Sequence, residues 1–145
     1  RHCNRRIEKG ASLTALGVDV GKARVGLAFE SQGLVLPLRT VARDGAYESI
    51  QIECEERKIE VIFVGLPLNL QGANTASTED AIAFAKNLDV DIPIRLIDER
   101  MTTNIALGGV KGRKNAKAEV DSLSAAEILK LGLSNPSLAK DVDGF

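Results

Sequence analysis

The chain has 145 residues, which is enough for one domain with a buried core and too few for two sizeable ones. Hydrophobic residues make up 44% and charged residues 27%, whereas aromatic residues make up only 3%, so the core is expected to be aliphatic. The net charge of −1 gives the whole chain no electrostatic attraction to nucleic acid, and any such binding would depend on local clusters of cations.

Cysteine, histidine and hydropathy narrow the chemistry further. Only Cys3 and Cys54 are present, which excludes a framework of several disulfides and a zinc site built on multiple cysteines, and indicates a reducing cytoplasm. No apolar run has membrane-spanning length and the basic start lacks the apolar stretch of a signal peptide, so neither export nor membrane insertion is expected. Because the single histidine, His2, lies in the basic first segment, carboxylates are the main catalytic candidates.

The first half of the sequence predicts an antiparallel meander. Apolar side chains alternate with small or polar ones over 13–20, a pattern typical of a strand with one apolar face. A turn at 22–23 leads to a second alternating segment over 25–29, and 34–41 is the expected third strand.

The second half predicts helices alternating with strands. The expected elements are a helix over 47–57, a buried strand over 61–64, a helix over 75–88, a strand over 94–97, a short helix from 102 or 103 to about 107, a loop over 108–117 and a last helix over 120–133. Ser77 and Thr78 are the capping candidates of the second helix.

This order of elements predicts an α/β fold with a mixed five-stranded sheet, in which an antiparallel meander is followed by parallel strands and helices cover both faces. We expect a basic N-terminal arm over 1–12, one domain over 13–134 and a frayed C-terminal tail over 135–145.

Asp19 is the first candidate for a functional residue. Gly17 and Gly21 share its parity, so they lie on the same face of the strand. Without side chains at these neighbours, a phosphate or a hydrated metal ion could approach the carboxylate closely. An aspartate that only helps to form the hairpin would show the same short pattern.

A second acidic candidate ends the strand over 94–97, where Asp98 and Glu99 are adjacent. Alternation points their side chains to opposite faces, so only one of them can lie beside Asp19. Parity does not decide between them, and a polar strand end with a local ion pair would give the same sequence.

Asp121 is predicted at the start of the last helix, where free N–H groups and the helix dipole stabilise a carboxylate by about 0.3–1 kcal/mol. Capping alone would explain it, although the small residues Ser124 and Ala125 share its face and leave room for an ion. Three converging carboxylates would repel one another without a cation. They would suit Mg²⁺, and two such ions about 3.5–4 Å apart could hydrolyse a phosphodiester.

Two other segments carry candidate binding residues. Asn69 follows the buried strand at its carboxyl end, where open α/β sheets place ligands, although a tight turn explains this residue equally well. A basic cluster precedes the last helix and suits phosphate contacts better than base stacking, unless it is simply solvated. Its cations are Lys111, Arg113, Lys114 and Lys117.

Four motifs occur in order between Leu13 and Leu133. They span 17–21 with 24–28, 64–69 with Gly72, 98–103, and 120–122 with 125–126 and 128–129. In these motifs the chain resembles the YqgF/RuvX family, small RNase H-like proteins described as Holliday junction resolvases or as nucleases that process pre-16S rRNA. The chain departs from the family's usual pattern in starting with Arg1 and in having a longer N-terminal arm.

The resemblance implies an RNase H-like fold and a nuclease that uses one or two Mg²⁺ or Mn²⁺ ions. It places the family's acidic residues on Asp19, Glu99 and Asp121, and so selects Glu99 over Asp98, and it places the family's basic loop on 111–117. For a fourth acid the sequence offers only Asp98 or Glu127.

The implied substrate is structured RNA, in processing of the 5′ end of pre-16S rRNA, with branched DNA in recombination as the alternative. The sequence does not separate them, because both are recognised largely by shape and backbone. A monomer or a weak homodimer is expected. An actin-like ATP-binding protein would need a second related domain, and a non-catalytic RNA-binding module would not need the acids.

Overall fold

The computed structural model describes residues 14–99 and 116–145, of which 116–123 are described as helical backbone only. The short helix predicted from 102 or 103 to 107 and most of the loop predicted over 108–117 lie outside these residues.

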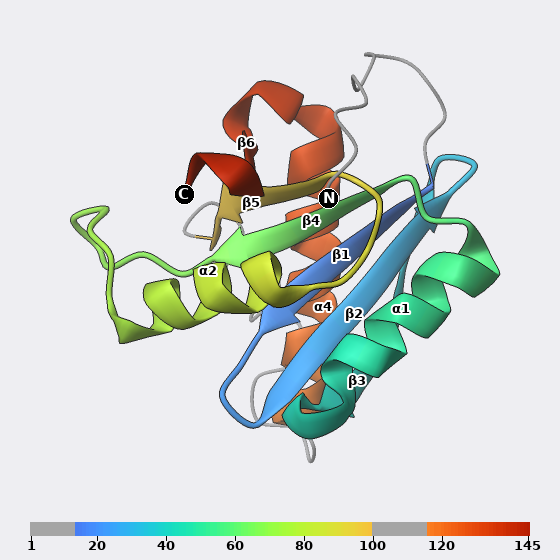
Figure 1. Ribbon diagram of the computed structural model, residues 1–145, viewed down its shortest axis with the longest axis horizontal. Coiled ribbons are helices and arrows are strands. Elements are labelled where there is room, and N and C mark those ends of the chain that lie inside the picture. The colour runs from blue at the N-terminus through green and yellow to red at the C-terminus, as the bar shows by residue number, and fades with distance from the viewer. Residues whose placement is uncertain (1–13, 100–115) are drawn as a thin grey trace.

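A mixed sheet forms the centre of the molecule (Figure 1). Its strands are β1 (Ala15–Val20), β2 (Arg24–Ser31), β3 (Leu34–Ala42), β4 (Val61–Leu66), β5 (Ile94–Asp98) and β6 (Lys140–Asp141). Their order in the sheet is β3-β2-β1-β4-β5-β6. β1, β2 and β3 pair antiparallel and β1, β4 and β5 pair parallel, which confirms the predicted meander followed by parallel strands.

The sheet has six strands instead of the predicted five, because β6 pairs antiparallel with β5. The expectation that the last residues fray was therefore wrong. Asp141 pairs with Arg95, and the next residue, Val142, is fully buried in the core. Burial of this apolar side chain holds the C-terminal segment against the domain.

Helices cover both faces of the sheet, as predicted. α1 (Ala46–Arg57) and α2 (Ala76–Asn87) lie on one face, and α4 (Ala116–Ser134) crosses the other (Figure 1). Three short 3₁₀ helices complete the described elements: Arg43–Gly45, Pro136–Leu138 and Val142–Gly144. Within residues 14–99 and 116–145, none of the helices combines the length and the apolar character that a membrane span needs.

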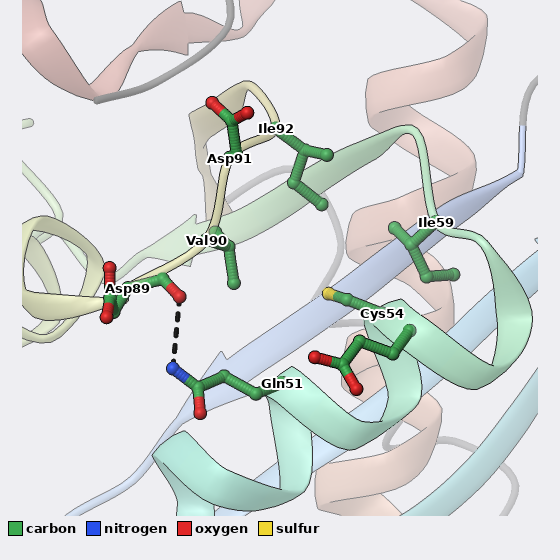
Figure 2. Close-up of a pocket in the computed structure, with 8 residues that line it drawn as sticks. Gln51, Cys54, Ile59, Asp89, Val90, Asp91 and Ile92 are labelled. Carbon is green, nitrogen blue, oxygen red and sulfur yellow. Dashed lines mark hydrogen bonds between the residues drawn. The ribbon is translucent and has the colours of Figure 1, made fainter.

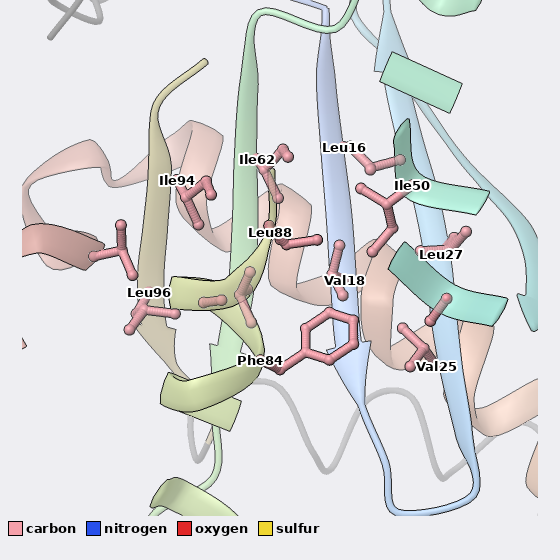
Figure 3. Close-up of a cluster of buried hydrophobic side chains, with 14 of the residues drawn as sticks. Leu16, Val18, Val25, Leu27, Ile50, Ile62, Phe84, Leu88, Ile94 and Leu96 are labelled. Atoms are coloured by element: carbon pink, nitrogen blue, oxygen red, sulfur yellow. The ribbon is translucent and has the colours of Figure 1, made fainter. Parts of the chain in front are cut away.

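Two apolar layers result from this arrangement. The first lies between the sheet and α1 and α2, and contains Leu16, Val18, Ile50 and Phe84 (Figure 3). The second lies under α4 and contains Phe63, Ile97, Ile128 and Leu129 among its members. Because side chains alternate along a strand, a residue of β1 that shares the parity of Gly17 or Asp19 faces α4 and not α1.

The cap of α2 differs from the prediction. Thr75, not Ser77 or Thr78, is the N-cap, and its hydroxyl accepts from the Thr78 N–H at 3.3 Å while the Thr78 hydroxyl accepts from the Thr75 N–H at 2.9 Å. This reciprocal capping box satisfies two N–H groups at the helix start. The Thr78 hydroxyl also donates to the carbonyl of Pro67, so the start of α2 holds the segment that leaves β4.

Candidate functional site

Asp19 is half-buried near the end of β1, on the face that α4 covers. A Cβ atom added at Gly17 would lie 2.4 Å from the carbonyl oxygen of Ala125 and 2.9 Å from the Cβ of Leu129, so the backbone of α4 touches β1 at this point. Gly17 therefore allows α4 to pack closely against β1. The sequence analysis had interpreted this glycine as space for a ligand to approach Asp19. Gly21 has a different neighbour, because its added Cβ would lie 2.7 Å from the carbonyl oxygen of Arg24 in the same turn.

Glu99 follows β5 directly and lies over Gly65 of β4. A Cβ atom added at Gly65 would lie 2.6 Å from Glu99 Oε1 and 2.7 Å from Glu99 Cγ. The same atom would lie 2.4 Å from Ile128 Cδ1, which places the Glu99 side chain on the α4 face of the sheet. Glu99 shares the parity of Ile97, which belongs to the apolar layer under α4, whereas Asp98 has the opposite parity.

The side chains of Asp19 and Glu99 are in contact at the carboxyl ends of β1 and β5. Burial, a hydrogen bond with Asp19 and the negative charges of Asp19 and Asp98 raise the pKa of Glu99 to about 9. Without a cation, the two carboxylates therefore share a proton at neutral pH. The geometry selects Glu99 over Asp98 as the partner of Asp19, a choice that parity alone left open.

The donor set suits a hard divalent cation. Two carboxylates in contact, one of them largely buried, offer the oxygen ligands that Mg²⁺ and Mn²⁺ prefer, and a cation would replace the shared proton. Among the residues whose side chains the structure describes, no group of three or more acids, histidines or cysteines is arranged to hold a metal ion.

Asp121 lies within α4, one turn before Ala125. The prediction that the last helix begins at Val120, with Asp121 at its N-terminus, was wrong, because α4 begins at Ala116. Residues 116–119 include two alanines, a lysine and a glutamate, which favour helix and extend it by a turn. The side chain of Asp121 lies outside the described residues, so its place as the third ligand remains a prediction.

The predicted nucleic-acid contacts are placed only in part. Lys111, Arg113 and Lys114 lie outside the described residues, and Lys117 is described only as helical backbone in α4. Asn69 lies in the loop between β4 and α2.

The side chain of Asn69 holds this loop together. Its Oδ1 accepts from the backbone N–H groups of Gln71 at 3.0 Å and Ala73 at 2.9 Å. The turn that the sequence left open is therefore present, and a contact of Asn69 with substrate remains a prediction.

A cavity of about 460 Å³ lies on the other side of the sheet, between α1 and the segment before β5 (Figure 2). Gln51 donates to the carbonyl oxygen of Asp89 at its rim, and Cys54 lines it. Burial and the neighbouring Glu53 and Glu55 raise the pKa of the Cys54 thiol to about 12. A thiol that stays protonated is a poor nucleophile or metal ligand, so we assign no chemistry to this cavity.

The sequence analysis did not identify Arg43, which lies behind the turn after Asp19. Its Nη1 donates to the carbonyl oxygen of Gly21 at 2.8 Å, and its guanidinium forms a two-point ion pair with Asp80. Since Arg43 and Asp80 are 37 positions apart, no local pattern could have indicated the pair.

The mixed sheet with helices on both faces is an RNase H-like fold, and its two contacting carboxylates lie at the carboxyl ends of β1 and β5. RuvC from Thermus thermophilus, solved alone and with a Holliday junction substrate, superposes with a TM-score of 0.50 in both cases and covers 89% of this chain and 99% of RuvC. The sequence identity is 12% and 13%, so this likeness shows the fold alone.

The chain belongs to the RuvX family, described as Holliday junction resolvase, whose model matches residues 13–135. A relative from Clavibacter michiganensis subsp. michiganensis is 39% identical, covering 89% of this chain and 88% of its own. Another from Leifsonia xyli subsp. xyli is 41% identical and covers 81% and 83%. Both relatives are named as pre-16S rRNA nucleases, and the names of family and relatives indicate a nuclease, which is a hydrolase.

Proposed function

We propose that this protein is a divalent-metal-dependent nuclease that hydrolyses phosphodiester bonds in pre-16S rRNA during ribosome biogenesis. The observation that carries the proposal is the contact between Asp19 and Glu99 on the α4 face of the sheet. Support for the substrate comes from the relatives named as pre-16S rRNA nucleases, which align with most of the chain. On this proposal the enzyme works in the cytoplasm.

Asp19 and Glu99 would hold Mg²⁺ or Mn²⁺, with Asp121 as the proposed third ligand. When bound, one or two such ions would activate water for attack and stabilise the leaving oxygen. The hydrogen bond between Asp19 and Glu99 holds a proton that a bound cation would displace, so metal binding would be favoured as the pH rises. Gly65 leaves the space that the Glu99 side chain occupies, and Ile128 limits its movement from the side of α4.

The basic residues before and within α4 would bind the nucleic-acid backbone in this proposal. Lys111, Arg113, Lys114 and Lys117 would contact phosphates, and the Asn69 loop at the carboxyl end of β4 would contact the substrate near the acids. Such contacts position structured RNA without reading its sequence. We propose a monomer or a weak homodimer as the active form.

Cleavage of branched DNA is the second candidate function. It is favoured by the description of the family as Holliday junction resolvase and by the fold of RuvC, which has been solved with that substrate. The same pair of carboxylates would serve either substrate, because the reaction at the phosphodiester is the same.

A cleavage assay distinguishes these functions. The purified protein is incubated with pre-16S rRNA fragments and with four-way DNA junctions, in Mg²⁺, Mn²⁺ or chelator. Metal-dependent RNA cleavage that is lost in Asp19→Asn and Glu99→Gln, and kept in the matched surface change Asp143→Asn, is the expected result. Cleavage of the junction alone would favour the second candidate, and binding without metal-dependent cleavage of either substrate would overturn the nuclease proposal.

A further inference from the structure

Arg43 connects the turn after β1 to α2 through its main chain and its guanidinium. Nη1 and Nη2 donate to Asp80 Oδ2 and Oδ1, both at 2.9 Å, and Nη1 also donates to the carbonyl oxygen of Gly21 at 2.8 Å. The Arg43 backbone N–H donates to the carbonyl oxygen of Ala23 at 2.9 Å. The guanidinium carbon lies 5.0 Å from the centre of the Phe84 ring. This two-point pairing fixes the plane and direction of the guanidinium.

The turn that Arg43 holds begins two residues after Asp19. The Gly21 N–H donates to the carbonyl oxygen of Arg24 at 2.9 Å and the Gly21 carbonyl accepts from Arg43, so Gly21 is held from both sides. The turn has no spare room, because a Cβ atom at Gly21 would lie 2.7 Å from the Arg24 oxygen. A displacement of this turn would therefore move the end of β1 and, with it, the carboxylate of Asp19.

Arg43 and Asp80 act from the face of the sheet opposite to the acids. Asp80 and Phe84 belong to α2, and the Phe84 ring stacks on Tyr47 of α1 with 4.6 Å between ring centres. α4 covers the other face, on which Asp19 and Glu99 lie. The pair therefore has no direct access to a substrate bound at the acids.

The ion pair between Arg43 and Asp80 is expected to contribute little to the free energy of unfolding. The side chains of Arg43 and Asp80 are 24% and 40% exposed, and pairs of this exposure contribute little to folding. The hydrogen bond lowers the pKa of Asp80 and raises that of Arg43, so both groups stay charged over the range of pH used in nuclease assays. The effect of the pair is to orient the guanidinium of Arg43, which also donates to the Gly21 carbonyl in the turn.

We propose that Arg43 and Asp80 form a positioning pair that fixes the turn after Asp19 and so sets the place of the Asp19 carboxylate for divalent-metal binding. The inference rests on the proposed function. Residues that orient a metal ligand from behind it change metal affinity or activity by about 10–100-fold when they are removed. Arg43→Ala is therefore expected to weaken Mn²⁺ binding by about tenfold.

A second arginine offers a matched control. Arg57 also pairs with a carboxylate, Glu53, at 2.6 Å, and its guanidinium lies 4.2 Å from the centre of the Phe29 ring. The ion pair lies within α1 and the ring contact joins α1 to β2, so neither touches the turn after Asp19. Arg57→Ala thus removes an arginine–carboxylate ion pair and a ring contact, in this case a single-point pair within one helix, and leaves the support of Asp19 unchanged.

The test measures Mn²⁺ affinity by calorimetric titration and, in the metal-free protein, hydrogen exchange of the Gly21 amide. Arg43→Ala and Asp80→Asn are expected to raise the Mn²⁺ Kd by about tenfold and to speed exchange at Gly21, whereas Arg57→Ala changes neither. If the alanine variant does not fold, Arg43→Lys keeps the charge and removes the two-point geometry, and the same changes in smaller size are expected.

Equal Mn²⁺ affinity and equal Gly21 exchange in the Arg43 variants and Arg57→Ala would overturn the inference. Cleavage is measured in parallel, where a lower kcat with unchanged KM for the nucleic acid is expected. Wild-type protein that binds Mn²⁺ but cleaves neither RNA nor DNA would refute the proposed function, while the titration would still decide the role of Arg43. If the wild type bound no Mn²⁺, the claim that Arg43 positions Asp19 for metal binding would be refuted, whatever the exchange data showed.

Discussion

Two glycine-to-alanine changes separate the stability of the fold from the geometry of the site. Gly17→Ala would place a Cβ atom 2.4 Å from the Ala125 carbonyl oxygen and 2.9 Å from the Leu129 Cβ. Heavy atoms in contact normally lie about 3.5–4.0 Å apart, so α4 would have to move away from β1 by about 1 Å. Both obstructing atoms belong to or adjoin the helix backbone and cannot turn aside. Overpacking of this kind costs about 1–3 kcal/mol.

Gly65→Ala meets a different kind of obstacle. Its Cβ atom would lie 2.4 Å from Ile128 Cδ1, 2.6 Å from Glu99 Oε1 and 2.7 Å from Glu99 Cγ, which are side-chain atoms and not backbone atoms. Side chains can rotate where a helix backbone cannot, so the free energy of unfolding is expected to fall by about 1 kcal/mol, the lower end of the range for overpacking. Rotation would, however, carry the Glu99 carboxylate away from Asp19. A misplacement of about 1 Å at a reacting centre can lower the rate by about 100-fold.

Thermal unfolding and cleavage assays on the same preparations test this contrast. For a chain of this length about 1 kcal/mol corresponds to about 4 °C, so Gly17→Ala should lower Tm by about 4–12 °C and Gly65→Ala by about 4 °C. Gly144→Ala is the matched control, because its added Cβ would have nothing within 4 Å, and it should change neither property. If Gly65→Ala destabilised the protein as much as Gly17→Ala and still cleaved like the wild type, the placement of Glu99 over Gly65 would be wrong.

Three further measurements test other parts of the structure. In chelator, the free energy of unfolding should fall as the pH rises from about 4.5 towards 9. The reason is that the pKa of Glu99 is about 9 in the fold and near 4.5 in the unfolded chain, so the fold binds more protons over this range. Glu99→Gln should flatten this pH dependence, as measured by urea unfolding. In a Cys3→Ser background, Cys54 should react with iodoacetamide about 1000-fold more slowly than a thiol of pKa 9, because the pKa of Cys54 is about 12. Rapid alkylation of the folded protein would contradict the burial of Cys54. Val142→Ala should cost about 2 kcal/mol in urea unfolding, since Val142 is fully buried, whereas an unaffected midpoint would mean that the C-terminal segment does not pack.

The sheet could be predicted from the sequence where its strands carry a long pattern. Alternation over β1 and β2 and the apolar run of β4 identified these strands to within a few residues of their bounds. β6 has only two residues and no pattern of its own. Its place depends on the antiparallel pairing with β5 and on the burial of Val142, which are long-range contacts that a local reading does not contain.

The candidate site was predictable in its residue types and only partly in its geometry. Parity showed that Asp98 and Glu99 must face opposite sides, but the choice between them depends on which face α4 covers. Ile97 lies in the apolar layer under α4, and the next residue of that parity is Glu99. The pairing of Arg43 with Asp80 has the same origin, because the fold alone brings the 3₁₀ helix Arg43–Gly45 and α2 together behind the turn that follows Asp19.

Glycine near an acid is an ambiguous signal for the same reason. Its presence indicates that some group approaches the backbone closely, but the sequence does not say which group. Here the helix backbone approaches at Gly17, the carbonyl of Arg24 approaches at Gly21, and the side chain of Glu99 itself approaches at Gly65. Of these three glycines, only Gly65 leaves space for a candidate site residue, Glu99, and Gly65 lies on a different strand from Asp19. The glycines around Asp19 could therefore indicate a site, but they could not predict which groups surround the carboxylate.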